Sequence, residues 1–464
     1  MPTATPFVRP SAMPIATPFS RPLCVMLKPA SAFCNLACEY CYYLEKGKVG
    51  SPPPFGGDRG ETSMLSDDLL ETFIRQYLEA QTMPEVLFTW HGGEPLLRPI
   101  AFYERALQLQ QKYARGRHVD NCLQTNGTLI NDEWCRFLRD NHFLVGISID
   151  GPQHLHDAYR RDRHGQPTWE RVMHGIRLLQ QHGVEWNAMA TVNRLNADHP
   201  HEFYRFFRDI GCQFLQFTPV VERFSAAPVA APPVADGLPV SSAAPRLLAG
   251  SEPGGQVAPF SVTPQQWGRF LCAVYDEWVR HDVGTIFVQI FDATLTNWAG
   301  VTPGLCSLGT SCAHNAVMET DGSVYCCDHF VFPDYLLGNI AQTASSPPNS
   351  PLTTHHLPLT SHFSVLTSHH SPPTLTQLLY GPRQQQFGRQ KTDALPRQCS
   401  ECSFLFACHG ECPRNRFATD RYGEPGLNYL CEGYRRFFAH VAADMDFMLA
   451  ELRAGRAPAN IMKR

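Results

Sequence analysis

The chain has 464 residues, which is enough for two or three domains, and 43% of them are hydrophobic, so a sizeable core is possible. Its formal net charge of −4 at pH 7 argues against nucleic acid or an anionic membrane surface as the main partner. The sequence contains no run of about 20 apolar residues, so we expect no transmembrane helix.

The first 20 residues are predicted to form a disordered leader. Prolines occupy the positions where a secretory signal needs an apolar core, and the segment ATPFVRP at residues 4–10 returns as ATPFSRP at residues 16–22. Without a signal peptide, the 17 cysteines of the chain argue for metal binding rather than for disulfides.

Residues 21–223 are predicted to form the first domain, in which β-type runs alternate with amphipathic stretches. The expected strands are residues 23–28, 85–90, 119–125, 143–150, 185–192 and 213–219, and the expected helices are residues 66–80, 100–115, 131–141, 168–182 and 201–210. Ser66 is expected to cap the first helix. Six such units argue for a parallel sheet with outer helices, and a partial (β/α)6 barrel fits this pattern. In such sheets the chemistry lies at the carboxyl ends of the strands.

A cysteine cluster follows the first predicted strand directly. Cys34, Cys38 and Cys41 form a C-x3-C-x2-C run. Three thiolates this close together can hold three irons of a cubic [4Fe–4S] cluster. No fourth cysteine follows at similar spacing, so one iron would stay open to bind another group. The alternatives are a zinc site or three unrelated buried thiols, but zinc sites usually have paired C-x2-C or mixed Cys/His ligands.

The second half of the chain divides by composition. Residues 224–260 are rich in Ala, Pro, Gly and Ser, which predicts a low-complexity linker. Residues 261–445 are expected to form a second domain, which opens with a helix capped by Thr263. Residues 341–373, rich in Ser, Thr, Pro and His, are expected to be a disordered insertion in that domain. The last part, residues 446–464, comprises the end of a C-terminal helix and a short tail.

The second domain carries nine further cysteines. They are Cys306 and Cys312; Cys326 and Cys327, which follow a predicted hairpin turn at residues 321–322; and Cys399, Cys402, Cys408, Cys412 and Cys431. Nine thiols are enough for two clusters with four thiolate ligands each, with one thiol left over, while structural zinc is the alternative.

Six motifs together resemble the radical S-adenosylmethionine (SAM) enzymes that carry an auxiliary-cluster (SPASM) domain, and most closely the anaerobic sulfatase-maturating enzymes. The motifs are KPASAFCNLACEYC at residues 28–41, GGEPLL at 92–97, LQTNGTLI at 123–130, FLVGISIDGP at 143–152, FLQF at 214–217 and DGSVYCCD at 321–328. The resemblance covers residues 21–223, 262–340 and 374–445, so the leader and the two low-complexity segments depart from it.

The resemblance implies a radical SAM partial barrel followed by a SPASM domain, with three [4Fe–4S] clusters and SAM as cofactors. It implies that Cys34, Cys38 and Cys41 ligate the cluster that binds SAM. The ligands implied for the two auxiliary clusters are Cys306, Cys312, Cys327 and Cys412 for one, and Cys399, Cys402, Cys408 and Cys431 for the other. Cys327 is chosen over Cys326 because its neighbour Asp328 matches the Cys–Asp pair of the family.

The GGE turn at residues 92–94 resembles the SAM-binding turn of the family. The resemblance implies that Gly92 and Gly93 let the backbone approach SAM and that Glu94 accepts from the SAM ammonium group. A structural turn would also use glycines, but the Glu–Pro pair that follows favours the functional interpretation. Where the family often has Gln before this turn, the chain has His91.

Four further residues align with SAM contacts of the family, namely Tyr40, Ser148, Arg160 and Val221. Ser148 and Asp150 lie at the end of the fourth predicted strand, where ligand contacts are expected, so Asp150 is also a candidate. Arg160 could pair with the SAM carboxylate, with a surface salt bridge as the alternative.

The implied reaction is oxidation of a Cys or Ser side chain, in a C/S-x-P-x-R motif of a sulfatase, to Cα-formylglycine. The reduced first cluster would cleave SAM, and the resulting 5′-deoxyadenosyl radical would remove a hydrogen from the substrate Cβ. Asp328 is the candidate base for the thiol or hydroxyl proton, with a hairpin-end residue that bonds its own backbone as the alternative.

The implied partners are an unfolded sulfatase polypeptide and an electron donor such as flavodoxin or ferredoxin, which the protein would meet in the cytoplasm under anaerobic conditions. Two other functions stay open: a SPASM enzyme that crosslinks a ribosomally made peptide, and a non-catalytic Fe–S or zinc protein. The remaining cysteines are expected to be core residues, namely Cys24, Cys122, Cys135, Cys212 and Cys272.

Overall fold

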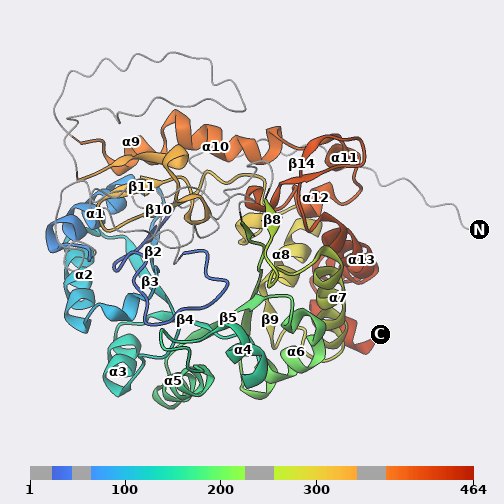
Figure 1. The fold of residues 1–464 in the computed structure, drawn as a ribbon, viewed down its shortest axis with the longest axis horizontal. Helices are drawn as coiled ribbons and strands as arrows, with labels where there is room; N and C mark the ends of the chain where they lie inside the picture. The colour runs from blue at the N-terminus through green and yellow to red at the C-terminus, as the bar shows by residue number, and fades with distance from the viewer. Residues whose placement is uncertain (1–22, 44–63, 225–254, 342–371) are drawn as a thin grey trace, which may run out of the picture.

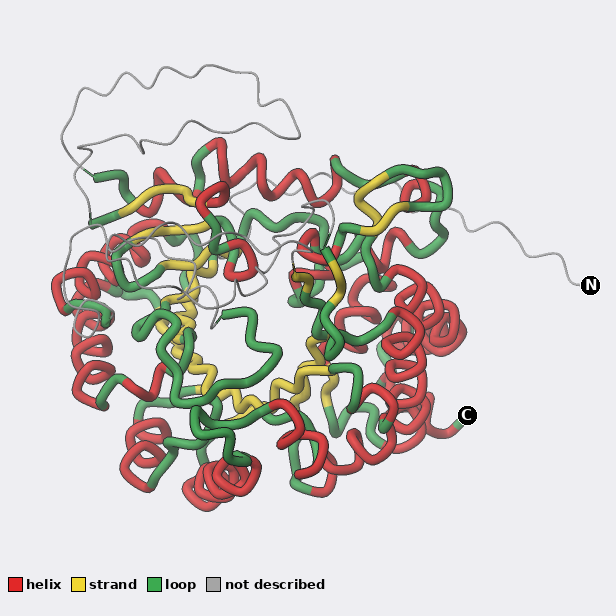
Figure 2. Tube along the Cα trace, in the orientation of Figure 1, coloured by secondary structure: helices red, strands yellow, loops and turns green. Residues whose placement is uncertain are grey.

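The computed structural model describes residues 23–43, 64–224, 255–341 and 372–464. In these ranges, parallel strands follow an open arc, with helices outside it and loops inside it (Figures 1 and 2). The strands along the arc are β1 (Cys24–Leu27), β2 (Glu85–Trp90), β3 (His118–Thr125), β4 (Leu144–Ser148), β5 (Trp186–Val192), β6 (Phe214–Pro219) and β9 (Phe287–Val288). The six strands expected in the first domain are all present and parallel to their neighbours, which confirms the partial barrel.

The helices of the barrel alternate with its strands. They are α1 (Asp67–Ala80), α2 (Ile100–Tyr113), α3 (Asp132–Asp140), α4 (Gln153–Tyr159), α5 (Trp169–His182) and α6 (Pro200–Asp209). The prediction is confirmed for all of them except α4, a helix of seven residues that the sequence analysis missed. Ser66 caps α1 as expected, because its hydroxyl oxygen accepts from the Leu69 amide at 3.3 Å.

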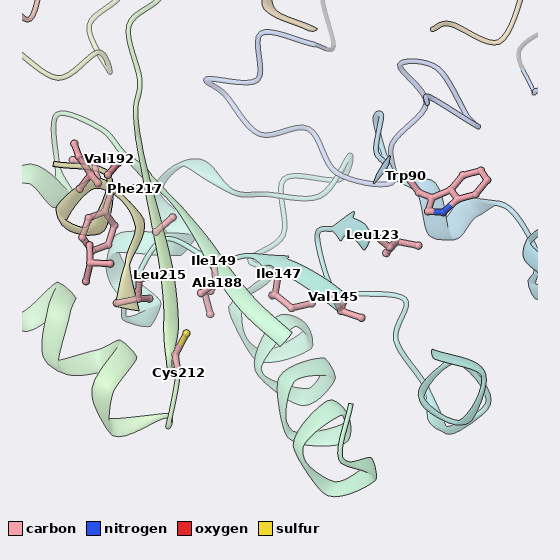
Figure 3. Packing of buried hydrophobic residues seen from close by; sticks show 14 of the residues in the cluster. Trp90, Leu123, Val145, Ile147, Ile149, Ala188, Val192, Cys212, Leu215 and Phe217 are labelled. Carbon is pink, nitrogen blue, oxygen red and sulfur yellow. The ribbon is translucent and has the colours of Figure 1, made fainter. Parts of the chain in front are cut away.

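The core of the barrel lies between the strands and these helices. Val145 and Ile147 of β4 are fully buried (Figure 3), because alternate side chains of a strand point to the same face of the sheet. On the helix side, Phe73 and Tyr77 of α1 lie one turn apart and pack edge-on against Phe88 of β2. Each such buried ring stabilises the fold by about 1.5–3 kcal/mol relative to an exposed one.

The second half of the chain extends this sheet and also forms a small separate one, in which β13 (Ala418–Thr419) pairs with β14 (Pro425–Leu427). β10 (Asn315–Met318) pairs in parallel with β1, and the antiparallel strands β11 (Ser323–Tyr325) and β12 (Leu336–Asn339) continue the sheet outward. The predicted hairpin is confirmed, with Gly322 at its turn in the left-handed region, at a φ of 85°. The strands next to the second cysteine region are therefore hydrogen-bonded to the edge of the barrel.

The helices of the second half cover this extension and the far end of the arc. They are α7 (Pro264–His281), α8 (Gln289–Trp298), α9 (Leu375–Leu379), α10 (Pro382–Asp393), α11 (Arg397–Ser400), α12 (Leu405–Cys408) and α13 (Cys431–Arg453). Thr263 caps α7 as predicted, in a reciprocal capping box with Gln266. The sequence analysis predicted only α7 and α13 in this half and missed α8, α9, α10, α11 and α12.

One predicted boundary differs from the structure. The linker was expected to reach residue 260, but β8 (Gln256–Val257) pairs with β7 (Arg223–Phe224), and Ala258 and Phe260 are buried. The ordered structure extends into the predicted linker because Ala258 and Phe260 pack in a small apolar cluster with Tyr40 and Val220. The predicted leader and insertion, by contrast, fall almost wholly outside the described residues. None of the described helices is long and apolar enough to cross a membrane.

Candidate functional site

The loop that follows β1 lies inside the arc of strands, where it is drawn in dark blue in Figure 1. It carries Cys34, Cys38 and Cys41, at the carboxyl end of β1 as predicted. The loop is held to the segment after α4, because the Ala37 amide donates to the Arg161 carbonyl at 2.8 Å. This anchoring brings the three thiols together in the concave side of the partial barrel.

Burial and mutual repulsion both disfavour free thiolates in this loop. Burial is the main reason that the pKa of Cys34 is raised to about 11 and the pKa of Cys38 to about 12, and the charge of neighbouring Cys41 contributes to both shifts. Three thiolates held this close need a bound cation to balance them, and an iron–sulfur cluster supplies one. The donor set therefore fits a cluster.

The GGE turn packs directly on this cysteine loop. The amide of Gly93 donates to the Ser31 carbonyl, and that of Glu94 donates to the Phe33 carbonyl, each at 2.7 Å. A Cβ on Gly93 would stand only 2.1 Å from the Phe33 carbonyl oxygen, and Gly92 has a φ of 139°. Glycine is therefore required here by the close approach of two backbone segments, whichever ligand the turn also contacts.

Glu94 ties the GGE turn to the end of β3. Its fully buried carboxylate accepts from the Leu96 amide at 2.9 Å, from the Thr125 hydroxyl at 2.7 Å and from the Asn126 amide at 2.8 Å. Burial raises its pKa to about 7. A carboxylate offers about four acceptor positions, so one position remains for a further donor such as an ammonium group.

Asn126 is a site residue to which the sequence analysis gave no role. Its side-chain amide donates to Cys34 Sγ at 3.7 Å and to Asn35 Oδ1 at 2.8 Å. The sequence analysis recognised the LQTNGTLI motif that contains Asn126. It did not identify the contacts of this side chain, because its partners lie about 90 residues away along the chain.

A buried ion pair lies beside the cysteine loop and involves three of the predicted residues. Asp150 is fully buried and accepts from Arg160 Nε at 2.9 Å and from the Tyr40 hydroxyl. The Arg160 guanidinium lies 5.5 Å from the centre of the Tyr40 ring, and its charge favours the thiolate form of Cys38. The surface salt bridge considered for Arg160 is wrong, because this pair is buried.

The other two predicted SAM contacts come from the same edge of the sheet. Ser148 ends β4, and its hydroxyl accepts from Gln124 Nε2 at 3.0 Å. Val221 follows β6 and is buried. Together with the GGE turn after β2, they put all the candidate contacts at or after the carboxyl ends of strands, where ligands of parallel sheets bind.

Asp328, the candidate base, meets residues from the first half of the chain. Its carboxylate lies 2.6 Å from Nζ of Lys28, a fully buried residue at the end of β1, and accepts from the Tyr42 hydroxyl. Lys28 Nζ also lies 3.1 Å from His91 Nδ1, to which the Gly92 amide donates at 2.7 Å. Nδ1 therefore acts as an acceptor, which assigns the ring proton of neutral His91 to Nε2.

This arrangement suits a proton acceptor. An ammonium group next to a carboxylate favours its ionised form, which is the form a base needs. The partners of Asp328 are side chains from a distant segment, so the interpretation as a residue that bonds only its own backbone is wrong. The sequence analysis gave no role to Lys28 or Tyr42, although both adjoin the first cysteine motif.

Four cysteines of the second half form a group next to this carboxylate. They are Cys306, Cys312, Cys327 and Cys412. Burial raises the pKa of Cys327 well above its usual value, and the charges of Cys306 and Cys412 raise it further. Cys326 is buried in a small cluster with Phe330 and Phe387, against which Cys312 and Cys327 also pack. The choice of Cys327 over Cys326 as a ligand stays a prediction.

The remaining four cysteines line a cavity of about 150 Å³. They are Cys399 of α11, Cys402 in the turn that follows it, Cys408 at the end of α12 and Cys431 at the start of α13. Phe404, Leu405 and Phe438 are among the other lining residues. Charged residues such as Glu401 and Arg435 also line it, and the four thiols that it brings together fit a cluster with four thiolate ligands.

Single-ion sites were the alternative for these cysteines. Among the described residues, no three His, Cys, Asp or Glu side chains are spaced to hold one metal ion.

Of the five cysteines expected in the core, Cys135, Cys212 and Cys272 are buried, while Cys24 and Cys122 are half-buried and share the Thr89 hydroxyl.

Comparison with known proteins connects these features. A family model described as the radical SAM superfamily matches residues 29–207. The chain is 52% identical to a serine-type anaerobic sulfatase-maturating enzyme of Bacteroides thetaiotaomicron, over 95% of this chain and 94% of that one. It is 30% identical to a cysteine-type anaerobic sulfatase-maturating enzyme of Clostridium novyi, over 90% and 94% of the two chains.

A solved structure shares this fold. It is described as native anSMEcpe with bound AdoMet and Kp18Cys peptide, and it is 26% identical to this chain with a TM-score of 0.71. The match covers 92% of this chain and 99% of that one, so it includes both the barrel and the cysteine-rich extension.

Proposed function

The chain belongs to the family of anaerobic sulfatase-maturating enzymes and is a radical SAM enzyme, and from this premise we propose that it oxidises a Cys or Ser side chain of a sulfatase to Cα-formylglycine. The proposed target is a C/S-x-P-x-R motif in an unfolded sulfatase polypeptide. The serine-type relative at 52% identity supports a serine substrate, and the peptide in the related structure supports a peptide-binding site.

The observation that carries the proposal is the contact of Asp328 with Lys28, which in turn contacts His91, the residue before the GGE turn. Asp328 comes from the cysteine-rich second half, yet its carboxylate lies 2.6 Å from a lysine at the carboxyl end of β1. The candidate base thus lies at the edge of the barrel where the first cysteine loop and the SAM-binding turn also lie. A reaction that needs hydrogen removal and proton removal from one substrate residue requires both at one place.

The roles of the residues follow from this geometry. Cys34, Cys38 and Cys41 would hold the cluster, and the GGE turn, with Ser148, Arg160 and Val221 nearby, would orient SAM. Cluster and SAM, when bound, supply the radical that removes one hydrogen atom from the substrate Cβ. Asp328 then takes the proton of the substrate hydroxyl or thiol, while Lys28 and Tyr42 hold its carboxylate in position.

The balance of the reaction requires an electron acceptor. After the substrate residue has lost a hydrogen atom and a proton, one electron must still be removed to form the carbonyl from Ser or the thiocarbonyl from Cys. Water then hydrolyses the thiocarbonyl to the carbonyl and releases hydrogen sulfide. We propose two auxiliary [4Fe–4S] clusters as acceptors, held by the two sets of four cysteines, for a total of three clusters. The buried thiols of one set and the lined cavity of the other support this. A flavodoxin or ferredoxin is the proposed donor to the first cluster.

The test is an anaerobic assay of the full chain. Protein reconstituted with iron and sulfide is reduced and given SAM with peptides that carry Ser-x-Pro-x-Arg or Cys-x-Pro-x-Arg, and 5′-deoxyadenosine and peptide mass are followed. We expect formylglycine in the wild type, little in Asp328→Asn, and wild-type levels in Asp334→Asn, an exposed acid near the same hairpin. SAM cleavage without any change of the peptide would refute sulfatase maturation and favour a peptide-crosslinking enzyme.

A further inference from the structure

Two buried cations lie beside the auxiliary cysteines without carboxylate partners. Lys391 is fully buried and Arg416 is 4% exposed. Lys391 Nζ donates to the carbonyls of Cys306 and Ser307, each at 2.7 Å. No described Asp or Glu comes within 4.0 Å of either side chain, whereas buried Arg160 and half-buried Arg414 each have a carboxylate partner.

Arg416 is wrapped by the loop that joins the two cysteine sets. This loop runs from Cys408, which belongs to one set, to Cys412, which belongs to the other. The guanidinium of Arg416 donates to the carbonyls of the three residues between them, at distances of 2.8 to 3.1 Å, and to that of Lys391 at 2.7 Å. The three intervening residues all have positive φ, and two of them, His409 and Glu411, are not glycine.

Such a conformation is unfavourable for residues other than glycine, so it requires compensation. Turning three carbonyls toward one guanidinium supplies it, because hydrogen bonds to a charged group are stronger than neutral ones. The loop is therefore built around the arginine.

The two cations lie differently with respect to the two cysteine sets. Arg416 is bound by the loop between Cys408 and Cys412, which belong to different sets, so its charge lies beside both. Lys391 is bound to the carbonyls of Cys306 and its neighbour, so its charge lies beside a single set. Glu411, which is buried in the same loop as an acid, would lose a nearby counter-charge if Arg416 were replaced.

We propose that Arg416 and Lys391 are the counter-charges of the auxiliary clusters and raise their reduction potentials, with Arg416 acting on both clusters and Lys391 on one. A buried charge without a partner is costly, and the negative charge of a thiolate-ligated cluster offsets that cost. Reduction adds one electron to a cluster, so a cation held nearby in a poorly solvated site stabilises the reduced form. This inference rests on the auxiliary clusters of the proposed function.

The experiment is a redox titration of the reconstituted full chain, monitored by electron paramagnetic resonance. In Arg416→Gln we expect the ratio of reduced to oxidised form to fall about tenfold for both auxiliary clusters, which is about 59 mV for a one-electron couple. Lys391→Gln is expected to lower the potential of one auxiliary cluster only. The cluster of Cys34, Cys38 and Cys41 should keep its potential in both variants.

Two further variants control for structural effects. Arg416→Lys keeps the charge and should keep both potentials near the wild-type values, and Arg389→Gln removes an exposed charge from the same helix as Lys391 and should shift none. If Arg416→Gln fails to load its clusters while Arg416→Lys loads them, the counter-charge role is supported. If neither variant loads, the role of the charge is refuted.

Other outcomes separate this inference from the proposed function. Wild-type protein that binds iron for one cluster only would refute the auxiliary clusters themselves. Fully loaded Arg416→Gln with unchanged auxiliary potentials, or with all three potentials lowered equally, would refute the inference and leave the proposed function standing.

Discussion

The buried pair of Lys28 and Asp328 gives a prediction whose size follows from the structure. The two charged groups lie 2.6 Å apart, and at an effective dielectric constant of about 20 they attract each other by about 6 kcal/mol. Removing one partner of a buried pair costs less than this, about 3–5 kcal/mol, because water and neighbouring groups rearrange around the remaining charge. Lys28 is fully buried and the Asp328 side chain is only 13% exposed, so the buried case applies.

We therefore expect Lys28→Met to lower the free energy of unfolding by about 3–5 kcal/mol. Asp328→Asn should also destabilise the protein, because it leaves the buried ammonium without its counter-charge. The double variant Lys28→Met/Asp328→Asn should cost less than the sum of the two single changes by at least about 2 kcal/mol, since it leaves no uncompensated charge.

The measurement is unfolding by urea, followed by tryptophan fluorescence, for the three variants and the wild type. The matched control is the exposed pair of Arg397 and Glu401, where Arg397→Met should cost less than about 1 kcal/mol because solvent screens the interaction. A double variant whose cost equals the sum of the single costs would refute the reasoning, as would a Lys28→Met cost no larger than that of the control.

Two further predictions concern a cluster ligand and pH. After reconstitution, Cys327→Ala should lack the iron of one cluster. Cys326→Ala removes a thiol packed against Phe330 and should bind as much iron as the wild type. Equal iron contents of the two variants would refute the choice between the two cysteines. Burial lowers the pKa of His156 from 6.5 to about 4, so between these values the unfolded chain binds the proton and the folded chain does not. Stability should therefore fall as the pH drops from 6.5 to 5, by about 2 kcal/mol from this group. In His156→Gln, the urea midpoint should change less with pH over that range than in the wild type. A pH dependence equal to that of the wild type would contradict the assignment.

The elements that the sequence analysis found are those with a clear local signal. Most of the barrel strands alternate or run continuously in apolar residues, although the buried face of β3 includes Asn121 and Thr125, and α1 and α7 begin with side-chain caps at Ser66 and Thr263. α10 was missed because its buried face includes Gln384, Gly388 and Lys391, which an amphipathic pattern counts as surface residues. Those polar side chains are buried because they bond backbone carbonyls of distant segments.

By itself, the sequence determined the barrel, the first cysteine set and the family, because strand periodicity, short motifs and the spacing of thiols within a loop are local properties of the chain. The division of the later cysteines into two sets of four was implied only by the family resemblance. Tertiary structure alone decided that β10 pairs with β1, which extends the barrel sheet into the second half. That pairing brings Asp328 to Lys28, some 300 residues earlier in the chain. Backbone hydrogen bonds between strands do not depend on which side chains the strands carry, so the sequence does not show which strands pair. A lysine or arginine can be recognised as buried only from the carbonyls and charges that the fold brings around it.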